Sequence, residues 1–152
     1  MTIYVYNKKL INDVVAASVP AKGSLSFGSK NRAYQWKNWS TNQEGYRWTD
    51  GKNPAIQLSP QTNWKTAKFV LYASSFQPLK GTLSANGIII SKLDLAAGVH
   101  EIVFSVKNKV SDKSILNFEF NFEHVKSPRD MDMNDDPRKL GLQVRRLDYS
   151  FQ

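Results

Sequence analysis

The feature of this sequence that most constrains its fold is a strict alternation of apolar and polar side chains. Residues 116–123 read Leu-Asn-Phe-Glu-Phe-Asn-Phe-Glu. A period of two places successive side chains on opposite faces of an extended chain, so this run predicts a strand with one buried face. Residues 66–76 are continuous and apolar-rich, which predicts a strand buried on both faces. Similar runs predict further strands at residues 3–6, 24–27, 34–39, 55–58, 81–85, 88–90, 98–106 and 142–151.

The number and spacing of these runs predict an all-β protein. About nine or ten short strands separated by Gly- and Pro-containing turns are typical of an antiparallel two-sheet β-sandwich, or jelly roll. Asn86-Gly87 between two of the runs is a strong hairpin signal. Only residues 10–17 are compatible with a short helix. A length of 152 residues fits a single domain, 1–152. A long irregular segment, residues 126–139, precedes the last strand, and loops of this length often carry function.

Positive charge and tryptophan are concentrated in the N-terminal half of the chain. The formal net charge is +8, and residues 1–68 hold ten Lys and Arg against three Asp and Glu. All four tryptophans lie in the same half, at Trp36, Trp39, Trp48 and Trp64. Flat apolar rings beside positive charge favour a partner that is anionic, flat-faced or both.

The residue types that common catalytic chemistry needs are scarce. The absence of Cys excludes disulfides, thiol catalysis and thiolate metal sites. The two histidines, His100 and His124, continue the apolar faces of predicted strands, which favours structural roles. No nucleophile elbow, phosphate-binding loop or paired-histidine motif is present. Glu44 and Asp50 could form a glycosidase-like carboxylate pair, but such pairs are common by chance. The sequence therefore predicts a protein that is not an enzyme.

The strongest candidate binding segment is residues 39–51, which its glycines and an Asp-Gly pair predict to be a loop with a tight turn. Tryptophan faces suit the C–H faces of sugar rings, while Arg and carboxylates can hydrogen-bond sugar hydroxyls. The predicted ligand-binding residues, which include one from the preceding strand, are Trp36, Trp39, Glu44, Arg47, Trp48 and Asp50. In the alternative interpretation, Tyr46 and Trp48 close one end of the sandwich and Arg47 pairs with Glu44.

A weaker hypothesis concerns calcium in the long loop. Its candidate ligands are Asp130, Asp132, Asn134 and Asp136. Alternate oxygen-bearing side chains resemble the start of a calcium loop, but Asp135 and Gly141 stand where an EF-hand needs Gly and Glu, which excludes that motif. Two interpretations remain: an irregular calcium site, or a solvated acidic loop in which Asp136 holds Arg138.

Two segments taken together resemble a known family. Residues 44–51, Glu-Gly-Tyr-Arg-Trp-Thr-Asp-Gly, followed by the predicted strand at 55–58, are similar to a signature near the start of the family's module. Ser127-Pro128, followed by Asp-Pro-Arg-Lys-Leu-Gly-Leu at 136–142, is similar to its ending. The family consists of jelly-roll, carbohydrate-binding-module-like domains attached to bacterial surface-polysaccharide glycosyltransferases and phosphoglycerol transferases. The resemblance covers about residues 30–152, although the glycine expected directly before Trp48 is displaced to Gly45.

The resemblance implies non-catalytic recognition of a bacterial surface polysaccharide, an acidic one included. It also implies a glycosyltransferase catalytic domain as a partner in the same chain or complex. Basic residues that would attract an anionic chain are Lys30, Arg32, Lys37 and Lys52. Some candidate residues would instead be architectural, with Asp136 and Arg138 tying the last strand to residues 44–48.

Two other classes of function stay open. Stacking aromatics in a basic groove also hold single-stranded nucleic acid, although no motif of a nucleic-acid-binding fold is visible. Sandwiches also serve as protein-interaction or structural parts, such as virion or tail components, effector accessories or immunity proteins, whose strand edges pair with a partner. No secretory or membrane-spanning segment stands out, which predicts a cytoplasmic location or excision from a larger or cell-envelope protein.

Overall fold

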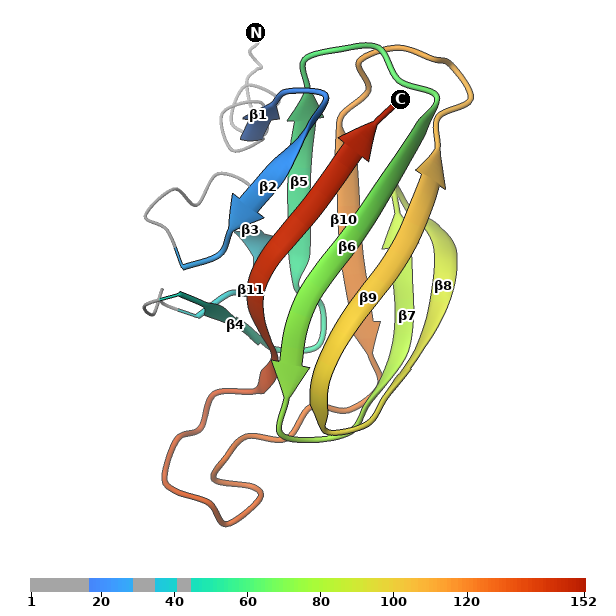
Figure 1. Cartoon of the computed structure of the whole chain (residues 1–152). Helices are drawn as coiled ribbons and strands as arrows, with labels where there is room; N and C mark the ends of the chain where they lie inside the picture. Colours follow the sequence, from blue (N-terminus) through green and yellow to red (C-terminus); the bar gives the residue numbers. More distant parts are fainter. Residues whose placement is uncertain (1–16, 29–34, 41–44) are drawn as a thin grey trace, which may run out of the picture.

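The computed structural model describes residues 17–28, 35–40 and 45–152, which fold as an all-β sandwich (Figure 1). The described residues contain eleven strands and no helix. The strands are β1 (Ala17–Val19), β2 (Lys22–Ser26), β3 (Gln35–Lys37), β4 (Arg47–Asp50), β5 (Ala55–Pro60), β6 (Thr66–Ser75), β7 (Leu79–Ala85), β8 (Ile88–Leu95), β9 (Gly98–Lys107), β10 (Leu116–Phe122) and β11 (Leu140–Phe151). The strand expected at residues 3–6 and most of the segment 10–17 lie outside the described residues. The sandwich that the alternation predicts is confirmed.

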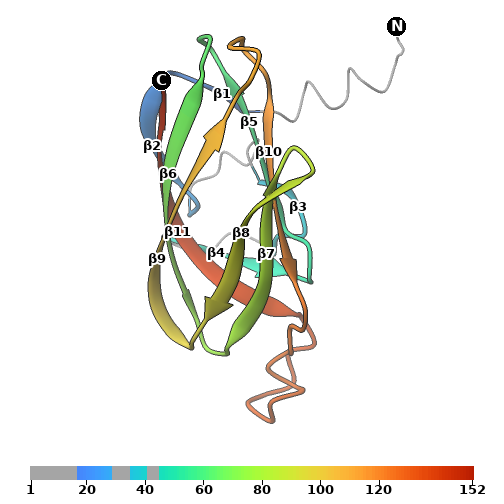
Figure 2. The same cartoon turned by 90° about the vertical axis from the view of Figure 1, so that its right-hand side faces the viewer.

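Two sheets face each other, as the turned view in Figure 2 shows. The six-stranded sheet has the order β1-β5-β10-β7-β8, with β3 also beside β5. The five-stranded sheet has the order β2-β11-β6-β9, with β4 also beside β11. Neighbouring strands are antiparallel except for β1 and β5, which run parallel.

One edge of the sandwich is closed by chain segments that cross between the sheets. Strands β1 and β3 pair with the two halves of β5, and β2 and β4 pair with the two halves of β11. Successive strands from β1 to β5 therefore alternate between the two sheets. The crossing between β3 and β4 is fastened by an antiparallel bridge between Trp39 and Thr49, where the Ser40 N–H donates to the Trp48 carbonyl at 2.9 Å. We call this side the closed edge.

The core is built from the inward residues of both sheets and is rich in phenylalanine. The Phe69 ring stacks on Phe104 with centroids 5.0 Å apart and meets the edges of Phe118 and Phe151 at 4.6 and 5.8 Å. The alternation in β10 buries Leu116 and its three Phe side chains, as the sequence predicts. Offset and edge-on contacts of this kind are the arrangements that aromatic rings favour.

Two local predictions have different outcomes. Asn86 and Gly87 both have positive φ, 49° and 84°, which the predicted two-residue hairpin between β7 and β8 requires. The prediction that residues 66–76 are buried on both faces is wrong. In β6 every second side chain is buried, whereas Lys68 is exposed and Val70 and Tyr72 are half-buried. Antiparallel sheets commonly leave one face to water, and no described residue forms a layer over this one.

The long loop between β10 and β11 projects from one end of the sandwich, as both views show. Its two ends are held by the buried side chain of Gln77. The Gln77 Nε2 donates to the carbonyls of Lys126 at 2.8 Å and Leu140 at 2.9 Å. Its Oε1 accepts from the Lys126 N–H at 3.0 Å. One side chain between β6 and β7 therefore fixes where the loop leaves and rejoins the fold.

Candidate functional site

The predicted site residues occupy several different environments. Trp39 is packed into the protein: its ring lies 5.2 Å from that of Phe27, and its Nε1 donates to the Ala55 carbonyl at 2.9 Å. Glu44 lies outside the described residues, as do Lys30 and Arg32. Trp36 belongs to β3, but its side chain is outside the described part of the chain.

The structure corrects one part of the predicted binding loop, because residues 47–50 are strand β4. Pairing with β11 makes these residues extended in spite of the flanking glycines. The Arg47 side chain points inward and is buried, and its Nε donates to the Ser40 carbonyl. The Asp50 carboxylate accepts the Lys139 N–H at 2.9 Å. Arg47 and Asp50 therefore hold the closed edge and the end of the long loop in place.

Trp48 alternates with these buried residues and lies on the solvent side of the five-stranded sheet, here called the outer face. Its pairing partner on β11 is Gln143. The Gln143 side chain is half-buried and accepts a hydrogen bond from the Ser74 hydroxyl of β6 at 3.0 Å. The Trp48 ring meets the ring of Phe76 edge-on, with centroids 5.4 Å apart and planes at 72°. Trp48 is therefore a half-buried aromatic residue on the outer face.

A second aromatic side chain lies farther along the same face. Tyr72 of β6 pairs with Arg146 of β11, whose guanidinium carbon lies 4.1 Å from the centre of the Tyr72 ring. Arg146 also bonds the Asp148 carboxylate at 3.0 Å. Contact with the Tyr72 side chain, followed by the charge of Asp148, raises the pKa of Arg146 above its usual value. The outer face thus carries a ring with a fixed cation and a fixed carboxylate beside it.

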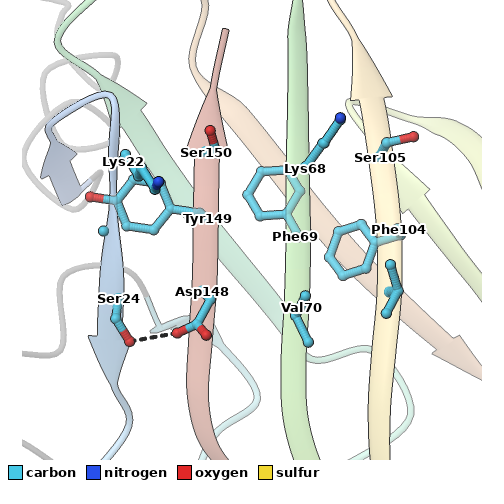
Figure 3. Close-up of a pocket in the computed structure, with 12 residues that line it drawn as sticks. Lys22, Ser24, Lys68, Phe69, Val70, Phe104, Ser105, Asp148, Tyr149 and Ser150 are labelled. Carbon is cyan, nitrogen blue, oxygen red and sulfur yellow. Dashed lines mark hydrogen bonds between the residues drawn. The ribbon is translucent and has the colours of Figure 1, made fainter.

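Beyond Tyr72 the outer face is hollowed (Figure 3). The hollow has a volume of about 860 Å³ and spans β2, β11, β6 and β9. Two rows of outward side chains cross it: Lys22, Ser150, Lys68 and Ser105, then Ser24, Asp148, Val70 and Val103. Between the rows lies an inward row in which Gly23 makes room for Tyr149, since a Cβ there would meet the Tyr149 hydroxyl at 2.8 Å.

Two carboxylates of the acidic loop form ion pairs with basic residues of the same loop. Asp136 receives the Arg138 guanidinium at 2.7 Å, and Asp130 receives the Lys139 ammonium at 2.6 Å. Hydrogen bonds from these two cations hold the pKa of each carboxyl at about 2. No three Asp, Glu or His side chains within the described ranges come together in a way that could hold a metal ion. The contact between Asp136 and Arg138 is the one that the second interpretation of this loop expects.

Of the four basic residues that the sequence predicts near the ligand, Lys37 and Lys52 lie within the described residues. Neither is on a strand neighbouring Trp48 or Tyr72. Lys37 forms an ion pair with Glu119 of the six-stranded sheet at 2.7 Å, and Lys52 is exposed in the turn before β5. Tyr72, Arg146, Lys22 and Lys68 were not predicted. The alternation in residues 66–76 puts the even-numbered positions on one side, and that pattern was the available signal for Tyr72 and Lys68.

The described residues define a two-sheet β-sandwich with one open sheet face. No family model matches the chain, and no curated protein matches its sequence. Within the parts of the chain that the structure describes, no helix is long and apolar enough to cross a bilayer.

Among solved structures, the chain is similar to a family 35 carbohydrate-binding module from Clostridium thermocellum. The TM-score is 0.51 at 9% identity, over 84% of this chain and 97% of that one. The mosquito-larvicidal Cry4Aa toxin of Bacillus thuringiensis gives a TM-score of 0.56 at 9% identity, over 90% of this chain and 25% of the toxin. An acetyl xylan esterase from the rumen bacterium Butyrivibrio proteoclasticus gives 0.50 at 12% identity, over 87% of this chain and 33% of the esterase. At these identities the similarity establishes the shared fold, which the toxin and the esterase use as one part of a longer chain.

Proposed function

We propose that this protein is a non-catalytic carbohydrate-binding module that holds a glycan on the outer face of the five-stranded sheet. The observation that carries the proposal is the position of Trp48, a half-buried aromatic residue on the open sheet face that also carries Tyr72. Aromatic rings on a rigid sheet offer flat apolar surface for the C–H faces of sugars at a small entropic cost. The shared fold with the module from Clostridium thermocellum supports the same class.

The polar groups around the two rings are suited to sugar hydroxyls. The Gln143 amide lies between Trp48 and the β6 strand, and Arg146 and Asp148 lie beside Tyr72. Each is already oriented by a partner: Ser74 donates to Gln143, and Asp148 accepts from Arg146. Polar groups held in place before binding lose less freedom on binding, and a charged donor or acceptor makes the stronger hydrogen bonds.

The resemblance of residues 44–51 and 136–142 to modules of surface-polysaccharide synthesis supports a finer proposal. The ligand is a bacterial surface polysaccharide, and the partner is a glycosyltransferase catalytic domain in the same chain or complex. Arg47 and Asp50 then serve this function indirectly, because their hydrogen bonds hold the strand that presents Trp48. Asp136 and Arg138 pair with each other within the long loop.

The experiment is titration of the protein against a panel of neutral and acidic bacterial polysaccharide fragments, followed by calorimetry with Trp48→Ala. We expect saturable binding that Trp48→Ala weakens by about tenfold or more, since a lost ring contact is worth on the order of 1 kcal/mol beyond its buried area. Ile89→Ala is the matched control, because Ile89 is an exposed apolar side chain (64%) on the other sheet. Thermal unfolding checks that both variants are folded. Absence of saturable binding to every glycan, or unchanged affinity in Trp48→Ala, would refute the proposal.

A second candidate, a protein-interaction or structural part, is favoured by one observation. Strand β8 is the outer strand of the six-stranded sheet, and Ile88 and Ile89 at its start are 67% and 64% exposed. An unpaired strand edge with apolar side chains is a ready template for a partner strand. Replacing both isoleucines by Lys separates the two candidates, because it leaves glycan binding on the outer face intact and disrupts assembly through β8.

A further inference from the structure

The hollow over β2, β11, β6 and β9 differs from the surface around Trp48 and Tyr72, because its outward side chains are mainly lysine, serine and valine. Its floor is made of short outward side chains, including Ser150, Ser105 and Val70, and that is why the surface sinks there (Figure 3). At about 860 Å³ it falls in the size range of small-ligand sites.

The charge of the hollow is positive and uncompensated. Lys22 and Lys68 stand on either side of Ser150 in one row across the sheet, with β11 between them. Both are exposed, and neither forms an ion pair or a hydrogen bond through its ammonium group with any described residue. Their backbones are two strand spacings apart, about 10 Å. Because a lysine stem is long and flexible, both ammonium groups can converge over Ser150.

The acidic residue of the hollow does not cancel this charge. Asp148 accepts hydrogen bonds from the Ser24 hydroxyl at 2.7 Å and from Arg146 at 3.0 Å. Its negative charge is thus matched by Arg146, so the two lysines remain as net positive charge at the other end of the hollow.

We infer that this hollow is an anionic subsite, which binds a sugar residue carrying a carboxylate, sulfate or phosphate group. The inference rests on the proposed function and names the substrate class: an acidic glycan whose chain stacks at Trp48 and Tyr72 and whose charged residue lies between Lys22 and Lys68. Serine hydroxyls on the floor hydrogen-bond the ring hydroxyls, and Val70 and Val103 contact its apolar face. The described lining of the hollow has no open aromatic ring for a nucleobase, since Phe69, Phe104 and Tyr149 are buried, so the hollow itself is suited to a charged sugar.

The test compares alginate, polygalacturonate and hyaluronan oligosaccharides with their carboxyl-reduced counterparts, which keep the sugar rings and lose the charge. We expect the protein to bind at least one acidic form about tenfold more tightly than its reduced counterpart at low salt. The variant Lys22→Gln/Lys68→Gln should lose that preference, and Lys22→Arg/Lys68→Arg should keep it. Chemical-shift changes on binding should include the amides of Gly23, Val70 and Ser150.

The matched control is Lys80→Gln/Lys92→Gln, which removes the same net charge from exposed positions on the six-stranded sheet. If this control lowers affinity as much as the hollow variant does, the effect is general attraction and the subsite is refuted. Equal binding of acidic and reduced glycans by the wild type also overturns the subsite, while the proposed function stands. No binding of any glycan overturns both, and steeply salt-dependent binding of single-stranded DNA without glycan binding assigns the lysines to nucleic acid instead.

Discussion

Two buried glutamines, one with its side-chain amide fully hydrogen-bonded and one with an unpartnered oxygen, allow a test of what holds the long loop. Gln77 makes three hydrogen bonds to the backbone of Lys126 and Leu140. Gln57 is equally buried, at 4% exposure, but its Oε1 has no hydrogen-bond partner in the described part of the chain. Replacing each by Met removes the amide and keeps nearly the same volume, so the comparison isolates the hydrogen bonds.

The expected magnitudes follow from these contacts. In Gln77→Met the Leu140 carbonyl is left buried and unpaired, and two partly buried groups of Lys126 lose their partner. At a net value near 1 kcal/mol per bond, with a larger penalty for the fully buried carbonyl, the free energy of unfolding should fall by about 3–4 kcal/mol. In Gln57→Met an unpartnered oxygen leaves the interior, so the change should stay within about 1 kcal/mol of zero.

Urea unfolding followed by tryptophan fluorescence measures both free energies, with the slope against urea as the check that unfolding stays two-state. Limited proteolysis provides a local readout, since releasing both ends of residues 126–139 should speed cleavage there. A loss below about 1 kcal/mol in Gln77→Met, or a larger loss in Gln57→Met, would refute this account of the loop.

Two further predictions concern residues near the proposed site. Trp39→Ala should lower the free energy of unfolding by about 2–3 kcal/mol, because the half-buried ring packs on Phe27 and its Nε1 bonds the Ala55 carbonyl. Calorimetric melting measures this, and a loss near zero would contradict an architectural Trp39. Asp130 and Asp136 have pKa values of about 2 when folded against a usual 3.8, so their stabilisation is present above pH 3.8 and is lost as the pH falls towards 2. Asp130→Asn/Asp136→Asn should therefore show a smaller fall in urea midpoint between pH 5 and pH 2 than the wild type, and an equal fall would contradict the ion pairs.

The sequence predicts most of the fold because most strands and turns have a local sequence pattern of their own. The period-two run at residues 116–123 becomes β10, and the Asn-Gly pair becomes the turn between β7 and β8. β4 was missed because its extended form depends on pairing with β11, some ninety residues away in the chain. Local composition, with a glycine on either side, favours a turn there, and the tertiary pairing overrides that preference.

The site is only partly predictable for the same reason. The residue type of Trp48 is enough to predict stacking, provided that its ring is exposed. Lys22 and Lys68 become neighbours only through the register of β2, β11 and β6, which no local pattern specifies. Trp39 has the same residue type and the same half-buried class as Trp48, and only its contacts with Phe27 and Ala55 indicate that its ring packs against the core.

The closed edge has a consequence for how the outer face meets a ligand. β4 is fastened on one side to β11 and on the other, through the Trp39–Thr49 bridge, to the strand beside β5. The backbone under Trp48 is therefore held on both sides at the closed edge. The outer strands β8 and β9 lie at the opposite edge of the sandwich (Figure 1). Under the proposed function, a long glycan lying along β4 and β11 meets contact points that are held at fixed spacing, so its affinity should depend on its repeat length as well as on its chemistry.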